Sequence, residues 1–193
     1  MKKILLLMII SFISASKPMA IVVRSTDKVE KCSFNSDCST IYPGSLIFTD
    51  DIIKTRSGSY TKIRFLDIDC DIKLYDKSKA VFKSGNAKDM NSSMMLAYGD
   101  ILVSTDKSLM NFSTPHLSFL NSSETIFYIS VDAKSNEKVY VIDGGIDVKE
   151  NSFITSSEKL DNGKMISFIK KAIISDSPKR IVKRIINRDI SFN

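Results

Sequence analysis

The sequence predicts an all-β protein, an antiparallel β-sandwich or β-roll of many short strands followed by a short C-terminal amphipathic helix. Two observations support this fold class. Runs of alternating apolar and polar residues recur at intervals of about ten residues, whereas apolar residues at helical spacing are nearly absent before residue 165. The runs are rich in Ile, Val, Phe and Tyr and end in Asp, Ser, Asn or Gly, which favour turns. Short strands joined by short polar turns are typical of antiparallel sandwiches.

Seven runs show the alternation most clearly. They are residues 61–67, 70–76, 79–84, 100–105, 125–132, 137–143 and 145–150. Asp143, Gly144 and Gly145 join the last two runs, and glycine accommodates the positive φ that tight hairpin turns require. We therefore expect a hairpin at Gly144. No linker or low-complexity tract interrupts the pattern, so residues 21–175 are expected to form one β-domain.

The first twenty residues have the layout of a bacterial secretory signal. A pair of lysines precedes an apolar run over residues 4–13, and small residues then lead to Ala20. The apolar run is short for a membrane-spanning helix. We expect residues 1–20 to be a cleaved signal peptide, which would place the remaining 173 residues (193 − 20) in the periplasm or outside the cell. An uncleaved anchor is the alternative, because Pro18 rather than alanine stands two residues before Ala20.

The formal charge of +6 is concentrated at the two ends of the chain. Residues 21–163 carry 17 basic and 20 acidic side chains, a balance of −3, whereas residues 164–193 carry 8 and 2, a balance of +6. The remaining three lysines lie in the first twenty residues. This distribution argues against a protein that binds nucleic acid over its whole surface.

The last residues, 176–193, have a different pattern. Ser177 is a candidate N-cap, and Pro178 suits the first position of a helix. At about 100° per residue, aliphatic side chains fall on one arc of this helix and basic side chains on the other. The aliphatic arc comprises Ile181, Val182, Ile185 and Ile186; the basic arc comprises Lys179, Arg180, Lys183, Arg184 and Arg188. We expect the aliphatic arc to pack on the β-domain. Contact of Arg180, Lys183 and Arg184 with an acidic partner or an anionic membrane is the alternative.

Three cysteines remain to be assigned. Cys32 and Cys38 enclose a polar, turn-prone segment, and export would permit oxidation. We expect a disulfide across a hairpin, because the alternative of a metal or redox pair lacks both C-x-x-C spacing and further ligands. Cys70 is left over and is expected to be a buried or half-buried thiol on a strand.

Five short motifs occur in order between residues 21 and 150. They are Gly44 with Asp50-Asp51, Ile52-Ile53 and Thr55; "RSGSYTKIRFLD" with "IKLYDKSKAVFK"; Leu96 with Gly99 in "LAYGDILVS"; the Thr114-Pro115 pair; and the valine-rich segment around Gly144. In this order they resemble the FecR domain, an extracytoplasmic module of iron-uptake signalling regulators. Two departures stand out: Asp50 replaces the usual glycine, and "NSSETIFYISV" lacks the Gly-Thr pair of the family.

The resemblance implies a scaffold and a class of function. The scaffold residues are Gly44, Asp51, Thr55, Gly99, Thr114, Pro115 and Gly144. We expect Asp51 to end a turn by accepting backbone N–H groups, and the hydroxyl of Thr55 to close the next turn. FecR regulators carry a cytoplasmic sigma-binding segment and a membrane helix before this domain. Here the domain follows the expected signal directly, so we do not expect transmembrane control of a sigma factor to transfer.

Candidate reactive groups are few. His116 is the only histidine and has no serine or cysteine motif beside it, so we expect a surface or edge residue rather than a catalytic base. Asp67, Asp69 and Asp71 would share one face of an extended segment. Calcium could use such oxygens, but the segment lacks the glycine and glutamate of an EF-hand, and a solvated hairpin turn is the interpretation we favour.

These observations lead to one functional expectation and one alternative. We expect an exported, non-enzymatic module that binds a protein partner in the bacterial cell envelope, with no cofactor, no metal and no nucleic acid. The alternative is a structural envelope component, or a surface binder of glycan or anionic lipid through the basic C-terminal helix. Met94 and Met95 would face opposite sides of a strand. We expect this segment to pack in the core, and exposure of one methionine to a partner is the alternative.

Overall fold

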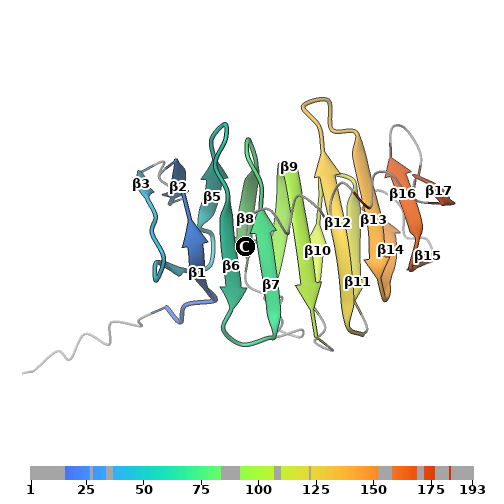
Figure 1. The fold of residues 1–193 in the computed structure, drawn as a ribbon, viewed down its shortest axis with the longest axis horizontal. Helices are drawn as coiled ribbons and strands as arrows, with labels where there is room; N and C mark the ends of the chain where they lie inside the picture. The colour runs from blue at the N-terminus through green and yellow to red at the C-terminus, as the bar shows by residue number, and fades with distance from the viewer. Residues whose placement is uncertain are drawn as a thin grey trace, which may run out of the picture.

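The computed structural model describes residues 16–26, 28–33, 37–83, 92–106, 110–121, 123–151, 158–168, 172–176 and residue 183. Seventeen β-strands in this part of the chain form two layers, which confirms the all-β class (Figure 1). The expected C-terminal helix lies outside the described residues except for Lys183, which is helical and exposed. Within the described ranges, no helix has the length and the apolar character needed to cross a membrane.

The first layer, sheet A, is antiparallel throughout. Its strands lie in the order β4 (Leu46–Ile47), β1 (Ala20–Ser25), β6 (Thr61–Phe65), β7 (Cys70–Leu74), the second half of β9 (Ser93–Thr105), β12 (Thr125–Val131), β13 (Glu137–Asp143), β16 (Lys164–Phe168) and β17 (Ala172–Asp176).

The second layer, sheet B, is antiparallel apart from its β9–β10 pair, which is parallel. Its strands lie in the order β3 (Cys38–Thr40), β2 (Val29–Cys32), β5 (Ile52–Thr55), β8 (Lys79–Lys83), the first half of β9, β10 (Asn111–Ser113), β11 (Leu117–Asn121), β14 (Gly145–Glu150) and β15 (Glu158–Asp161).

The main core lies between the two layers. Alternate residues of each strand point into it, as the period of two in the sequence requires. Aromatic rings join the layers at two places. The ring of Phe65 in sheet A lies 5.7 Å from that of Phe82 in sheet B, and the rings of Phe112 and Phe127 lie 5.2 Å apart. All four side chains are at most 2% exposed.

Strand β9 belongs to both layers. Its first half pairs with β8 and β10 in sheet B, and its second half pairs with β7 and β12 in sheet A. The change of sheet falls at Gly99, where φ is +97°. A Cβ atom at this position would lie 2.4 Å from the Cα of Ser78, so only glycine fits without a shift of the backbone.

The segment around Gly144 is not the hairpin expected from the sequence. β13 pairs with β12 and β16 in sheet A, whereas β14 pairs with β11 and β15 in sheet B. The chain therefore turns a corner from one layer to the other, and Val141 and Ile146 remain in the same core on either side of it. Gly144 has φ +76°, and a Cβ there would lie 2.2 Å from the carbonyl oxygen of Glu124. Glycines at this position permit a corner as readily as a hairpin, so the hairpin predicted from the sequence was wrong.

A second apolar cluster lies on the outer face of sheet A. It contains Tyr75, Leu102, Tyr128 and Tyr140, with the partly buried Ile126, Ile142 and Met165 around it. Leu102 alternates with Ile101 and Val103, which face the main core, so its side chain points away from that core. The ring of Tyr128 lies 6.2 Å from that of Tyr75 and 6.1 Å from that of Tyr140.

Candidate functional site

Gly44, Asp50 and Asp51 shape the turns that precede β5. Gly44 has φ +91°, and its N–H donates to the carbonyl of Val22 at 2.8 Å. Asp51 Oδ2 accepts the N–H of Phe48 at 2.8 Å, a turn-closing bond of the kind expected for this carboxylate. Asp50, which stands where the family usually has glycine, has φ +66°. The replaced glycine therefore falls at a left-handed position that aspartate tolerates.

The hydroxyl of Thr55 closes a turn that is distant in sequence. Its side chain is 5% exposed. The hydroxyl donates to the carbonyl of Tyr75 and accepts the N–H of Ser78 at 2.9 Å. This turn joins β7 to β8, whereas the turn directly after Thr55 is held by the hydroxyl of Ser59, which donates to the carbonyl of Arg56 at 2.6 Å. Thr55 thus connects sheet B to the turn beside Gly99.

The Thr114-Pro115 pair lies in a tight turn between β10 and β11, built over a buried carboxylate. Glu137 has no exposed surface, and its Oε2 accepts the hydroxyl of Thr114. Its Oε1 accepts the backbone N–H of His116 at 2.9 Å and lies 3.0 Å from Nδ1 of the His116 ring. From the end of β14, the side-chain amide of Asn151 donates to the carbonyl of Thr114 at 3.0 Å.

His116 has a structural setting at the edge of this turn. Its side chain is 41% exposed, and the ring stacks on Phe168 with centroids 4.6 Å apart. Glu137 orients the ring. Among the residues that the structure describes, no serine, threonine or cysteine side chain forms a hydrogen bond with the His116 ring. Glu137 was missed from the sequence, where it is one of many acidic residues; the only available signal was its place at the first inward position of an alternating run.

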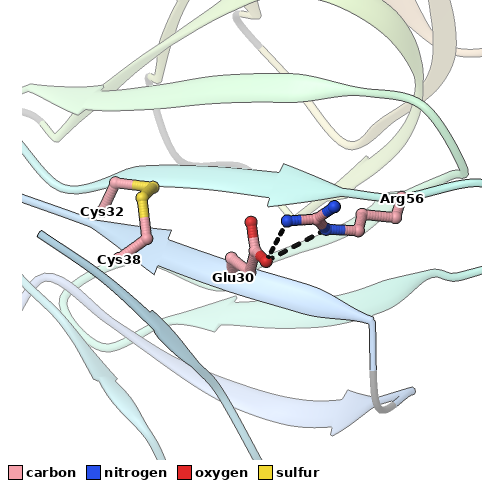
Figure 2. The surroundings of a disulfide bond; sticks show 4 residues. All are labelled: Glu30, Cys32, Cys38 and Arg56. Atoms are coloured by element: carbon pink, nitrogen blue, oxygen red, sulfur yellow. Dashed lines mark hydrogen bonds and ion pairs between the residues drawn. A yellow bond between two sulfur atoms is a disulfide. The ribbon is translucent and has the colours of Figure 1, made fainter. Parts of the chain in front are cut away.

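The disulfide expected from the sequence is present. Cys32 and Cys38 face each other across the β2–β3 hairpin, with Cα atoms 4.0 Å apart (Figure 2). On β2 next to it, Glu30 accepts two hydrogen bonds from the guanidinium of Arg56, at 2.6 and 3.0 Å. Cys70 is a buried free thiol at the start of β7. Burial, with a smaller contribution from neighbouring aspartates, raises the pKa of Cys70 well above its usual range, so this thiol stays protonated.

The aspartates around the β6–β7 hairpin do not gather. Asp71 forms a bidentate pair with Arg64, at 2.7 and 2.9 Å, and this hydrogen bonding holds the pKa of Asp71 below its ordinary value. Asp67 accepts the hydroxyl of Ser92 at 2.9 Å. In the described part of the chain, no group of three or more His, Cys, Asp or Glu side chains is placed to hold a metal ion.

A cleft of about 440 Å³ opens at one end of the sandwich. It lies between the β7–β8 turn and the β12–β13 turn, which Figure 1 shows at the same end of the molecule. Its lining consists of Lys77, Ala97, Tyr98, Gly99, Val131, Asp132, Ala133 and Ser135. Tyr98 is 44% exposed, one of few large apolar side chains on the described surface.

Two features fix the walls of the cleft. Lys77 has φ +53°, so it turns the chain sharply between β7 and β8. Asp132 closes the opposite turn, because its carboxylate accepts the N–H groups of Lys134 and Asn136 at 2.7 and 2.9 Å. Gly99 was predicted as a scaffold residue; the structure adds that it lies in the cleft beside Tyr98. Of the methionines, Met94 is buried in the main core and Met95 is partly exposed.

The remaining site residues lie in the C-terminal segment. Arg180 and Arg184 are outside the described residues, and Lys183 is exposed.

Comparison with known proteins identifies a similar fold. Two crystal structures of a protein described as a "putative anti-sigma factor" from Parabacteroides distasonis ATCC 8503 match with a TM-score of 0.57 and 12% sequence identity. The matches cover 68% and 70% of this chain. The chain spans 62% and 64% of the length of those two structures. No family model matches the sequence, and no curated protein matches it. At this identity the likeness concerns the fold.

Proposed function

We propose that this chain is an exported FecR-like module that binds a protein partner in the bacterial cell envelope and regulates that partner, without catalysing a reaction. The observation that carries the proposal is the fold shared with a protein described as a "putative anti-sigma factor", taken together with the ordered FecR-like motifs. Anti-sigma factors act by binding other proteins, so a shared β-domain favours a binding role over chemistry. Membership of the FecR family is part of the proposal.

The roles of the polar motif residues agree with this proposal. Asp51, Thr55 and Thr114 all hold turns through hydrogen bonds to backbone groups. Glu137, the buried carboxylate, accepts bonds that fix the turn of Thr114 and orient His116. These groups set the shape of the surface, and that is what a binding module requires of them.

The surface that we propose for the partner is the cleft around Tyr98. An exposed tyrosine supplies a large, rigid contact area together with a hydroxyl that can hydrogen-bond, and tyrosine is enriched in protein–protein interfaces. Lys77 and Asp132 place one charge of each sign on the rim. This mixture suits a polypeptide with both apolar and charged side chains better than it suits a uniformly anionic ligand.

The second candidate function rests on the charge of the C-terminal residues. The balance of +6 over residues 164–193 would attract an anionic membrane surface or an acidic polysaccharide. In this case the C-terminal segment, rather than the cleft, would carry the binding.

The two candidates are separated by comparing three forms of the full-length chain. They are the Tyr98→Ser variant, the Tyr42→Ser variant as a matched control with an exposed tyrosine outside the cleft, and a chain that ends at residue 176. We expect crosslinking in intact cells to give a protein adduct that is lost with Tyr98→Ser and kept in the other two forms. Binding to vesicles of anionic phospholipid that is lost only on truncation would instead favour the second candidate. Fractionation of the same cells checks export.

A further inference from the structure

The residues on either side of the expected signal cleavage site belong to the folded domain. Ala20 is the first residue of β1, has no exposed surface, and pairs with Ile47 and Phe65. Met19 is 8% exposed. Its N–H donates to the carbonyl of Ile47 at 2.8 Å, and its own carbonyl accepts the N–H of Leu66 at 2.9 Å. Both residues therefore lie within sheet A, between β4 and the end of β6.

Cleavage directly after Ala20 would damage this part of sheet A. It would remove two buried side chains and the backbone hydrogen bonds of Met19, and would leave the N–H of Leu66 without its acceptor. It would also place the charged amino terminus on Ile21, inside β1, next to the emptied site of Ala20. A cut at this position conflicts with the fold.

A second cleavage site lies four residues earlier. Before the peptide bond that joins Ser16 to Lys17, the last position is Ser16 and the third-last is Ser14, and signal peptidases require small side chains at these two positions. Both Ser16 and Lys17 are exposed, so a charged terminus there is solvated. We propose that a signal peptidase hydrolyses this bond: water is consumed, Ser16 gains the new carboxylate, and Lys17 gains the new ammonium group. This inference rests on the export proposed above.

Intact-mass measurement of the protein recovered from the envelope fraction tests the assignment. We expect a chain of 177 residues (193 − 16) that begins at Lys17, and a shift or loss of cleavage in the Ser16→Lys variant. The Thr26→Ser variant serves as the control, since it lies beyond both sites. A chain that begins at Ile21, or an exported chain without cleavage, overturns the inference while export stands. Retention of the whole chain in the cytoplasm would instead overturn the proposed export.

On the outer face of sheet A, one row of side chains crosses several strands. From β9 toward β17 the register aligns Leu102 with Tyr128, Tyr128 with Tyr140, Tyr140 with Met165, and Met165 with Ser175. Leu102, Tyr128 and Tyr140 are 9%, 8% and 4% exposed. Cross-strand neighbours cover only the flanks of side chains on an open sheet face, and their tips normally remain in water. The low exposed fractions of these three side chains therefore indicate that another segment covers them.

The C-terminal segment has the position, the length and the pattern to provide this cover. Residue 177 follows β17, which is the edge strand of sheet A beside β16. A helix over residues 177–189 would be about 20 Å long at 1.5 Å per residue. The row from β17 to β9 spans four strand spacings, about 19 Å. The aliphatic arc of the segment supplies a matching apolar surface through Ile181, Val182, Ile185 and Ile186.

We propose that residues 177–193 lie across the outer face of sheet A, with their aliphatic arc on the row from Met165 to Leu102. The basic arc then faces away from the sheet, in agreement with the exposure of Lys183. This proposal assigns the basic side chains to a continuous outward surface of the β-domain rather than to a detached tail.

Chemical labelling of the full-length chain tests this arrangement. In a chain that carries both Ile181→Asp and Ile185→Asp, we expect hydroxyl-radical labelling of Tyr128 and Tyr140 to rise several-fold, while Lys183→Asp leaves it unchanged. Circular dichroism of each variant verifies the β-fold, and truncation after residue 176 repeats the test without new charges. Unchanged labelling in the double variant and in the truncated chain overturns the proposal. Wild-type labelling that falls as protein concentration rises would also overturn it, because a second copy would then cover the face.

Discussion

Replacing Gly99 by alanine should destabilise the domain more than a comparable change elsewhere. Two costs add at this position. An L-residue in a left-handed conformation costs about 1–2 kcal/mol. The new Cβ would also lie 2.4 Å from the Cα of Ser78, so the β7–β8 turn must move, an overpacking cost of about 1–3 kcal/mol. The sum, about 2–5 kcal/mol, is a large part of the roughly 5–15 kcal/mol typical of a folded domain.

Gly58→Ala provides the matched control. Gly58 has φ +73°, but no atom lies within 4 Å of the position that a Cβ would occupy there, so only the conformational cost of about 1–2 kcal/mol applies. Urea unfolding followed by circular dichroism measures both variants. We expect Gly99→Ala to lose about 1–3 kcal/mol more than Gly58→Ala. Equal losses would show that β9 does not bend against the β7–β8 turn as described.

Four further predictions concern single side chains or the disulfide. Thr55→Val should lower the free energy of unfolding by about 1–3 kcal/mol, because a buried backbone N–H loses its acceptor, whereas Thr55→Ser should retain most of the stability in urea unfolding. Reduction of the Cys32–Cys38 disulfide should cost about 2 kcal/mol in the same assay, because the bond closes a short loop. Cys70 should react with a thiol reagent at about pH 8 only after unfolding, as a colorimetric thiol assay would show. The pKa of Asp71 is lower in the folded state, so its ionised form stabilises the fold at pH values above the unfolded pKa of about 3.9. This contribution disappears as the pH falls through the folded pKa of Asp71. Asp71→Asn should therefore flatten the acid limb of a profile of the free energy of unfolding against pH.

Local pattern was sufficient to predict most strands in the middle of the chain. The runs predicted at 137–143 and 145–150 coincide with β13 and β14, and the runs at 61–67 and 70–76 contain β6 and β7. Each of these strands buries one face, so apolar and polar residues alternate clearly along its sequence. The strands that bear weaker signals, such as β2 and β3, are short. β3 also lies at the edge of sheet B beside β2, and its residues are all exposed, so polar side chains obscure the alternation there.

Pairing between strands could not be read from the same pattern. The corner at Gly144 and the bend at Gly99 place consecutive segments in different layers, and this depends on contacts with Glu124 and Ser78 that are distant in sequence. The cleft beside Tyr98 arises from two turns 54 residues apart at Lys77 and Val131 (131 − 77), so no local motif could predict it. The disulfide was predictable because both of its cysteines lie in one hairpin.

The most direct test of the account is site-specific photo-crosslinking of the full-length chain in intact cells. A photoreactive amino acid is placed at position 98, in the cleft, or at position 42, an exposed tyrosine outside it. We predict a discrete adduct with one envelope protein from position 98 and none from position 42. Adducts of equal yield from both positions, or adducts with lipid alone, would contradict the proposal that this β-domain binds a protein partner through the cleft.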